Sequence, residues 1–203
     1  DIQNPKEKQF IIILGRSGAG KGTQALLLKK ALEEKGYEKV EHVTTGGGFR
    51  AFNEGGTYAA KLSNELTNRG GLGPEFLAIW VWSNIFINLF KGNETVILDG
   101  APRKIEERVA LGSAISFFEY KKPVVIYLDA PELWSLDRLH ERGREDDMKA
   151  ESTTRKMSWF DTEVLPVIEA YSQDPTVHYL HINGKQSIDE VHKEILEKLD
   201  SVL

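Results

Sequence analysis

Residues 15–24, with the sequence GRSGAGKGTQ, place a lysine and a threonine among glycines at a spacing that suits phosphate binding. The glycines allow successive backbone N–H groups to turn toward one point. Lys21 adds a full positive charge there, and Thr23 offers a hydroxyl that can bind the Mg²⁺ of a nucleoside triphosphate. The apolar run 10–14 predicts a strand before the glycines, and a helix is expected after them. This strand, loop and helix layout predicts a phosphate-binding loop (P-loop).

A carboxylate and a set of arginines form the second group of candidates. Asp99 ends the apolar stretch 95–98, where it can hold Mg²⁺ directly or through water; the alternative is a helix cap. Guanidinium groups bind phosphate with two parallel hydrogen bonds and stay charged. Several arginines that converged on one point would neutralise two phosphate chains meeting end to end. Each arginine taken singly is as well explained by a surface ion pair. The arginines near expected strand ends and glycine turns are Arg50, Arg103, Arg138, Arg142, Arg144 and Arg155.

The elements that must position these residues alternate along the chain. Strands are expected at 10–14, 39–43, 95–98, 123–128 and 176–182. Helices are expected at 22–35, 58–69, 74–90, 105–120, 132–141, 151–171 and 188–199, and a glycine-rich turn at 44–50. The alternation predicts an α/β fold, namely a P-loop three-layer α/β/α sandwich with a five-stranded parallel sheet and a small helical insertion. Ligands of such sheets bind at the carboxyl ends of the strands, where the candidate residues fall.

Composition limits the function classes. A chain of 203 residues with 40% hydrophobic content suits one domain, and a net charge of −5 argues against a nucleic-acid partner. The absence of cysteine and the spacing of the five histidines predict no zinc site. The apolar stretch 76–90 is too short and too polar to span a membrane, and is expected to be a buried helix. A cytoplasmic location with no membrane partner is therefore expected.

Three motifs resemble those of the adenylate kinase family of nucleoside monophosphate kinases, over most of the chain from residue 10. Residues 15–24 resemble G-x-x-G-x-G-K-G-T-Q, and residues 45–50 resemble T-G-x-x-x-R. Residues 98–103 resemble L-D-G-F-P-R, with Ala101 in place of phenylalanine. The resemblance implies Mg²⁺-dependent, reversible transfer of a phosphoryl group from ATP to AMP, giving two ADP. It also implies a core of residues 1–43 and 74–203, a monophosphate-binding insertion at 44–73 and a vestigial lid loop at 141–147.

The resemblance further implies a role for each matching residue. The catalytic residues would be Lys21, Arg103, Arg142, Arg144 and Arg155. The residues that bind ATP would be Gly15, Ser17, Gly18, Ala19, Gly20, Lys21, Gly22, Thr23, Gln24, Arg138, Lys185 and Gln186. The residues that bind AMP would be Thr45, Gly46, Arg50, Leu72, Gly100, Arg103 and Glu107. Thr23 and Asp99 would hold Mg²⁺, partly through water.

Two departures from the family pattern stand out. Only Gly143 separates Arg142 from Arg144, where the family carries a lid or a longer loop. We therefore expect a kinase without a lid, with either a slower transfer or shielding by another protomer, which leaves monomer and homo-oligomer open. The second departure is Glu107, which stands where the family has a glutamine that reads adenine. We favour AMP as the acceptor, with GMP or another monophosphate as the alternative.

Other classes of function remain open at this point. Loss of a lid would suit a nucleotide-binding module without catalysis, and an open site would suit an NTP hydrolase. A small-molecule kinase would share the P-loop but gives no reason for the motif at 45–50. Lys21, Asp99 and the arginine set favour phosphoryl transfer.

Overall fold

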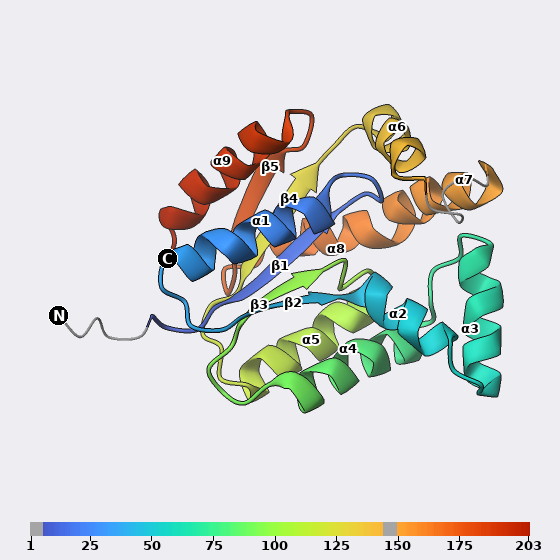
Figure 1. Ribbon diagram of the computed structural model, residues 1–203, viewed down its shortest axis with the longest axis horizontal. Coiled ribbons are helices and arrows are strands. Elements are labelled where there is room, and N and C mark those ends of the chain that lie inside the picture. Colours follow the sequence, from blue (N-terminus) through green and yellow to red (C-terminus); the bar gives the residue numbers. More distant parts are fainter. Residues whose placement is uncertain (1–5, 144–149) are drawn as a thin grey trace.

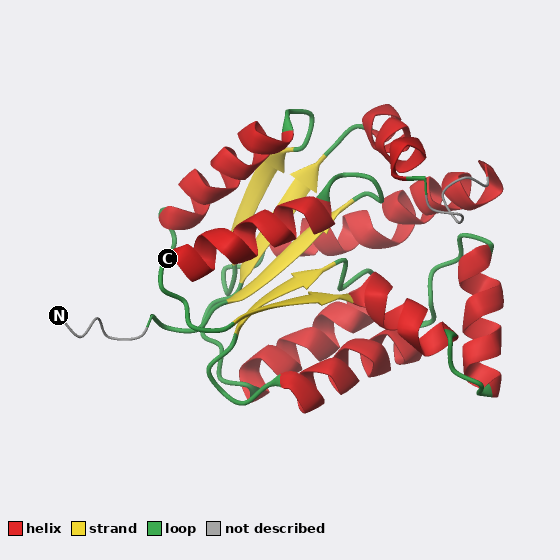
Figure 2. Ribbon diagram, viewed as in Figure 1, coloured by secondary structure: helices red, strands yellow, loops and turns green. Residues whose placement is uncertain are grey.

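Five parallel strands form the centre of the protein. The computed structural model describes residues 6–143 and 150–203 (Figures 1 and 2). The strands are β1 (Phe10–Gly15), β2 (Val40–Thr44), β3 (Thr95–Asp99), β4 (Val124–Asp129) and β5 (His178–Asn183). They pair in the order β2-β3-β1-β4-β5, and every pair is parallel. The predicted five-stranded parallel sheet is confirmed.

Helices cover both faces of this sheet, as Figure 2 shows. One face carries α1 (Lys21–Glu34) and α9 (Ile188–Asp200), and the other carries α4 (Glu75–Leu89), α5 (Ile105–Phe117) and α8 (Leu165–Ser172). Beyond the carboxyl ends of the strands lie α2 (Thr45–Asn53), α3 (Tyr58–Asn68), α6 (Glu132–Arg142) and α7 (Ala150–Trp159) (Figure 1). The predicted three-layer α/β/α sandwich is confirmed.

The central strand β1 explains why the sheet has two cores. Phe10, Ile12 and Leu14 point to the face covered by α4, α5 and α8, while Ile11 and Ile13 point to the face covered by α1 and α9. All five are almost fully buried. A strand with helices on both sides has no solvent-facing positions, and this accounts for its unbroken apolar sequence.

Residues 45–50, expected with Thr44 as a glycine-rich turn, belong to helix α2, so that expectation was wrong. Thr44 caps the helix by accepting a hydrogen bond from the backbone N–H of Gly47 at 3.1 Å. Glycine is a poor helix former, but Gly48 packs against α4 so closely that a Cβ would lie 2.5 Å from Cγ1 of Val81. Close packing between α2 and α4 therefore outweighs the intrinsic preference of the glycines.

This packing gives a prediction for two glycines that both lie inside helices. Gly48→Ala is expected to lower the free energy of unfolding by about 1–3 kcal/mol, because the new methyl group overlaps buried Val81. Gly112→Ala in α5 is expected to raise it by up to about 1 kcal/mol, because a Cβ there meets nothing within 4 Å. Urea denaturation of both variants measures the difference. Equal effects at the two positions would contradict the packing argument.

The predicted helix 151–171 runs through but contains a π-helical turn, η1 (Phe160–Val164), between α7 and α8. Pro166 stands near the start of α8 and has no N–H to donate one turn back. The N–H of Leu165 bonds instead to the carbonyl of Phe160, five residues earlier. Asp161, in this wider turn, pairs with Arg16 of the P-loop at 2.7 Å.

Helix α4 is buried on one face only, which corrects the expectation of a buried helix. Val81, Trp82 and Phe86 are buried against the sheet and its neighbours, whereas Phe76 and Ile87 are about 70% exposed. The apolar residues of this helix are spread over both faces, so the sequence alone did not distinguish the two sides. In the described ranges 6–143 and 150–203, no helix has the length and apolar character needed to cross a membrane.

Candidate active site

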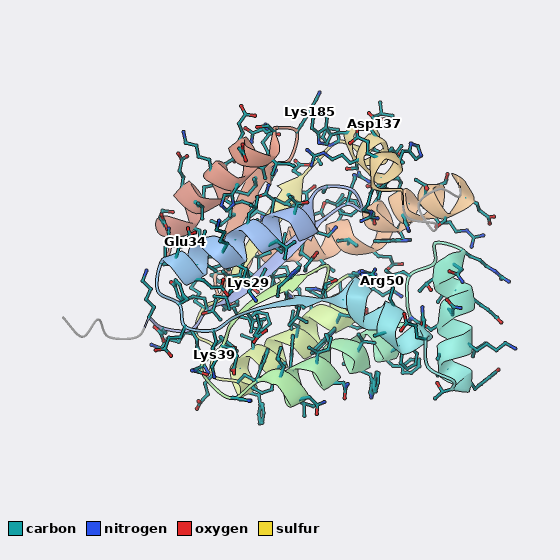
Figure 3. All side chains as sticks on the ribbon, viewed as in Figure 1. Lys29, Glu34, Lys39, Arg50, Asp137 and Lys185 are labelled. Atoms are coloured by element: carbon teal, nitrogen blue, oxygen red, sulfur yellow. The ribbon has the colours of Figure 1, made fainter. Side chains whose placement is uncertain are left out.

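The strand register brings the predicted site residues to one edge of the sheet. Asp99 at the end of β3 is level with Ile13 of β1 and with Thr44 of β2. Because all strands run parallel, the P-loop, the start of α2 and the loop after β3 begin side by side. Figure 3 shows Arg50 projecting from α2, with Lys185 and Asp137 of α6 on the opposite side of the site.

Lys21 lies inside the P-loop. Its Nζ donates to the carbonyl oxygens of Gly15 at 2.9 Å and Arg16 at 2.8 Å. Burial lowers the pKa of Lys21 to about 8; Asp99 opposes this shift, while Arg103 and Arg142 add to it. The ammonium group thus lies in a site with more positive than negative neighbours. A phosphate would supply the missing negative charge.

The P-loop is fixed against α6 by contacts that require glycine. Gly18 has a φ of +86°, and a Cβ on it would lie 2.2 Å from the carbonyl oxygen of Ser135 in α6. A Cβ on Gly20 would lie 3.1 Å from Nη1 of Arg138, whose guanidinium group also lies 5.1 Å from the centre of the Trp134 ring. Helix α6 therefore sets the position of the loop and places Arg138 beside it.

Asp99 faces the first turn of α1. Its Oδ2 lies 3.5 Å from the position of a Cβ on Gly22, and 3.4 Å from Nε2 of His42. Thr23, in the same turn of α1, is exposed. Carboxylate and hydroxyl oxygens suit Mg²⁺, so Thr23 and Asp99 fit the predicted metal role. Within the described part of the chain, no three His, Cys, Asp or Glu side chains gather to hold a metal, so phosphate oxygens would have to supply further ligands.

Arg103 lies in the loop after β3, within the electrostatic influence of Asp99. Its Nε donates to the carbonyl oxygen of Gly100 at 2.7 Å, and its guanidinium group lies 5.7 Å from the ring centre of Trp159 in α7. Burial lowers the pKa of Arg103 and Arg50 lowers it further, while Glu107 and Asp99 raise it. Arg50 and Arg103 are thus close enough for their like charges to repel each other. A shared anion would stabilise both.

The segment between α3 and α4 reaches α7. The indole N–H of Trp159 donates to the carbonyl oxygen of Gly70 at 3.0 Å. Gly70 has a φ of +74°, and a Cβ there would lie 2.4 Å from the carbonyl oxygen of Ser152. These contacts join the loop between α3 and α4 to α7, the helix whose Trp159 lies beside Arg103.

Some predicted residues make other contacts. Arg155 pairs with Glu151 at 2.5 Å on the surface of α7. Gln24 is buried and donates from Nε2 to the carbonyl oxygen of Ile188 at 2.9 Å, which ties α1 to α9. The backbone before Lys185 is held beside β4 by a bond from the N–H of Gly184 to the carbonyl of Asp129, at 2.8 Å. The nucleotide roles of these residues stay predictions.

The remaining predictions have less structural detail. Thr45 is fully buried at the start of α2, and its hydroxyl has no hydrogen-bond partner. Leu72 is half-buried in the loop before α4. Arg144 and most of the predicted lid loop 141–147 lie outside the described residues. The helices that flank this loop end at Arg142 and begin at Ala150.

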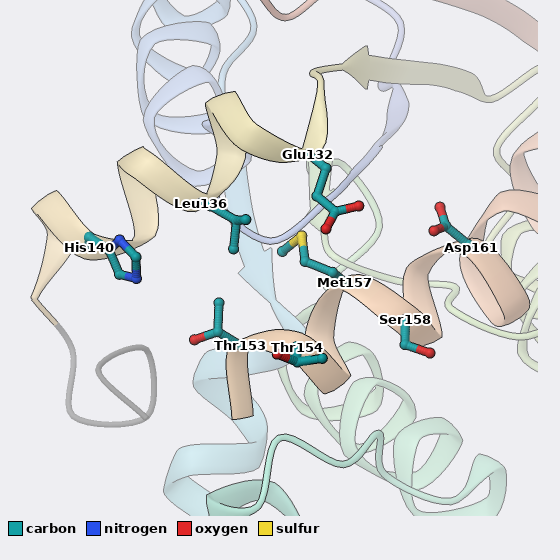
Figure 4. Close-up of a pocket in the computed structure, with 8 residues that line it drawn as sticks. All are labelled: Glu132, Leu136, His140, Thr153, Thr154, Met157, Ser158 and Asp161. Atoms are coloured by element: carbon teal, nitrogen blue, oxygen red, sulfur yellow. The ribbon is translucent and has the colours of Figure 1, made fainter. Parts of the chain in front are cut away.

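A pocket of about 400 Å³ opens between α6 and the side of α7 and η1 that faces it (Figure 4). It is lined by Glu132, Leu136, His140, Thr153, Thr154, Met157, Ser158 and Asp161. None of the predicted site residues lines it, and its connection to the P-loop is the ion pair between Asp161 and Arg16. A phosphate site built from backbone N–H groups at a helix start needs no such cavity.

His42 and Trp159 were missed in the sequence. His42 is next but one to the end of β2, and only the pairing of β2 with β3 places it beside Asp99. Trp159 follows Arg155 by four residues, a spacing that puts both on one side of a helix. That spacing was the one local signal that Trp159 contributes to the site.

The fold and the site together define a P-loop phosphotransferase in which the carboxylate of Asp99 acts electrostatically on both Lys21 and Arg103. The adenylate kinase family model matches residues 13–176. Adenylate kinases of Bacteroides thetaiotaomicron and Bacteroides fragilis are each 30% identical to this chain over 195 residues, which covers 95% of this chain and 98% of each relative. An adenylate kinase of Prochlorococcus marinus is 30% identical over 192 residues, with 95% and 99% covered. The chain belongs to the adenylate kinase family, and is thus a nucleoside monophosphate kinase.

Proposed function

We propose that this protein transfers the terminal phosphoryl group of ATP to AMP. The observation that carries the proposal is the mutual electrostatic influence of Lys21, Asp99 and Arg103. Lys21 is the first residue of α1, within the P-loop motif that follows β1, and Arg103 belongs to the loop after β3. A site with cations from two loops suits two phosphate groups that approach each other, rather than one nucleotide alone.

The donor side is the P-loop with Arg138. Backbone N–H groups at the start of α1 and the ammonium group of Lys21 would hold the β- and γ-phosphates of ATP. Arg138, beside Gly20, would lie against the donor nucleotide, and the backbone at Lys185 and Gln186 would border its adenine. Mg²⁺ bound with ATP at Thr23 and Asp99 would neutralise charge on the transferred group.

The acceptor side is the insertion 44–73 with the loop after β3. Arg50 and Arg103 would bind the phosphate of AMP and point one of its oxygens at the γ-phosphate. Arg142, whose charge influences Lys21, would stabilise the charge on the group in transfer, and Arg144 and Arg155 would complete this set. No side chain needs to form a covalent bond, because alignment and charge stabilisation lower the barrier in this reaction.

The length of the connection between α6 and α7 affects how well the site can exclude water. Residues 143–149 alone join the two helices, so we infer that this kinase works without a lid domain. Water would then reach the γ-phosphate more easily than in a closed site. Shielding by a second protomer would make specific activity rise with protein concentration, and a constant specific activity would contradict it.

The test is a coupled assay of ADP formation from ATP and Mg²⁺ with AMP, GMP, CMP or UMP, and with ATP alone. We expect AMP to give the highest kcat/KM among the four and ATP alone to give a rate lower by orders of magnitude. ADP formation that does not depend on a monophosphate would indicate an NTP hydrolase. No turnover with any acceptor would indicate a binding module.

A further inference from the structure

Glu107 is a buried carboxylate without a hydrogen-bond partner. It lies in the first turn of α5, is 1% exposed, and neither Oε1 nor Oε2 accepts a hydrogen bond. An unsatisfied carboxylate in a protein interior costs several kcal/mol, so such a group points to a ligand that satisfies it. The indole N–H of Trp82 in α4, also buried, is likewise without a partner.

Glu107 adjoins the acceptor side of the site. It follows Arg103 by four residues, and the charges of the two side chains influence each other. The hydroxyl of Thr45, at the start of α2, is a further unsatisfied buried group near the strand edge from which Arg103 emerges. A ligand whose phosphate binds Arg103 would carry its other end toward these polar atoms.

The charged and titratable groups around Glu107 come from three elements. Burial raises its pKa, whereas the charge and the backbone N–H of Arg103, the indole of Trp82 and the charge of Lys104 lower it; neither N–H group reaches hydrogen-bond geometry with the carboxylate. Tyr171 of α8 also lies within its electrostatic influence. Burial is the largest effect, and the pKa of Glu107 is raised above its usual value. The neutral acid is therefore more accessible here than at the surface.

The two protonation states of a carboxyl group recognise different bases. A neutral acid has one O–H donor and one carbonyl acceptor, the pattern that adenine needs at N1 and N6. A carboxylate has two acceptors, the pattern that guanine needs at its N1–H and N2–H groups. Glutamine has the first pattern at every pH.

We propose that Glu107 selects the base of the monophosphate, binding AMP as the neutral acid and GMP as the carboxylate, so that base preference changes with pH. This inference rests on the proposed function, because it takes the acceptor to be a purine monophosphate. It makes Glu107 a specificity residue that contacts substrate through hydrogen bonds to the base edge.

The experiment compares the parent protein with Glu107→Gln from about pH 6 to about pH 9. Binding of AMP and of GMP is measured by calorimetry, and kcat/KM by the coupled assay. For AMP, the ratio of parent to variant is expected to fall about tenfold for each pH unit above the pKa of Glu107. For GMP, the ratio is expected to rise with pH up to that pKa and to stay level above it, and Glu107→Gln to bind GMP at least about tenfold more weakly than the parent at high pH. Taking the ratio removes the titration of phosphate and of Lys21, which the two proteins share.

Glu106→Gln is the matched control, since Glu106 lies in the same turn of α5 but is exposed. It changes the net charge equally, and its binding is expected to follow the parent at every pH. A ratio of parent to Glu107→Gln that does not change with pH, for either ligand, would overturn this inference even if AMP is phosphorylated. Binding that shows the expected pH dependence, without ADP formation, would sustain the inference while the proposed transfer fails.

Discussion

Replacement of Lys21 by methionine is expected to lower kcat/KM for ATP by about a thousandfold or more, without loss of the fold. The ammonium group is held within the P-loop by two backbone carbonyls, where the phosphates of ATP would bind. Its removal takes away the charge that would contact the transferred phosphoryl group. Steady-state kinetics with ATP and AMP measure the loss.

The stability of Lys21→Met provides an independent check. The pKa of Lys21 is about 8 in the folded protein and higher in the unfolded chain, so folding works against the charged form at neutral pH. That unfavourable contribution is present below pH 8 and fades as the pH rises toward the unfolded value. Lys21→Met should therefore unfold at the same or a higher temperature than the parent at pH 7. A much lower Tm would mean that Lys21 is mainly structural.

Lys29→Met is a suitable control for that variant. Lys29 lies on the same helix and pairs loosely with Glu33 at the surface, 3.9 Å away. Surface pairs of this kind contribute little to stability. Kinetics of Lys29→Met are expected to match those of the parent within about twofold.

The second large effect is expected for Arg103→Lys, which keeps the charge. Lysine cannot reproduce the two parallel hydrogen bonds of a guanidinium group, nor its donation to Gly100 and its stacking on Trp159. We expect kcat/KM for AMP to fall by about a hundredfold, with a smaller change in KM for ATP. Equal losses for both substrates would contradict the placement of Arg103 on the acceptor side.

Arg108→Lys controls for the structural part of this effect. Arg108 is also an arginine that combines an ion pair, 2.5 Å from Asp174, with a position over an aromatic ring, Tyr171. Arg108 lies on α5, four residues after Lys104. Its partners belong to α8 and the turn that follows it, not to the strand ends. Its replacement is expected to lower Tm but to leave KM for AMP unchanged.

The local features of the site could be predicted from the sequence. The P-loop, the five strands and Asp99 at a strand end each follow from a pattern within about ten residues. Contacts between distant segments could not be predicted in this way. The helical form of 45–53 depends on Val81, and the contact of Gly70 with α7 depends on Ser152 and Trp159. Arg155 pairs with Glu151 at the surface of α7, and the spacing of residues in the sequence does not determine which rotamer, and hence which partner, an arginine side chain adopts.

The strand order has a consequence for synthesis on the ribosome. Strand β1 is made first, but both of its neighbours, β3 and β4, are encoded much later, at Thr95–Asp99 and Val124–Asp129. Until residue 95 has left the ribosome, the apolar run from Phe10 to Leu14 has no strand to pair with, and β2 cannot substitute because it pairs with β3 alone. A nascent chain that stops short of β3 therefore exposes an unpaired apolar strand, the kind of segment that chaperones bind. The P-loop that follows β1 gains its close contact with α6 only after Ser135 has been made.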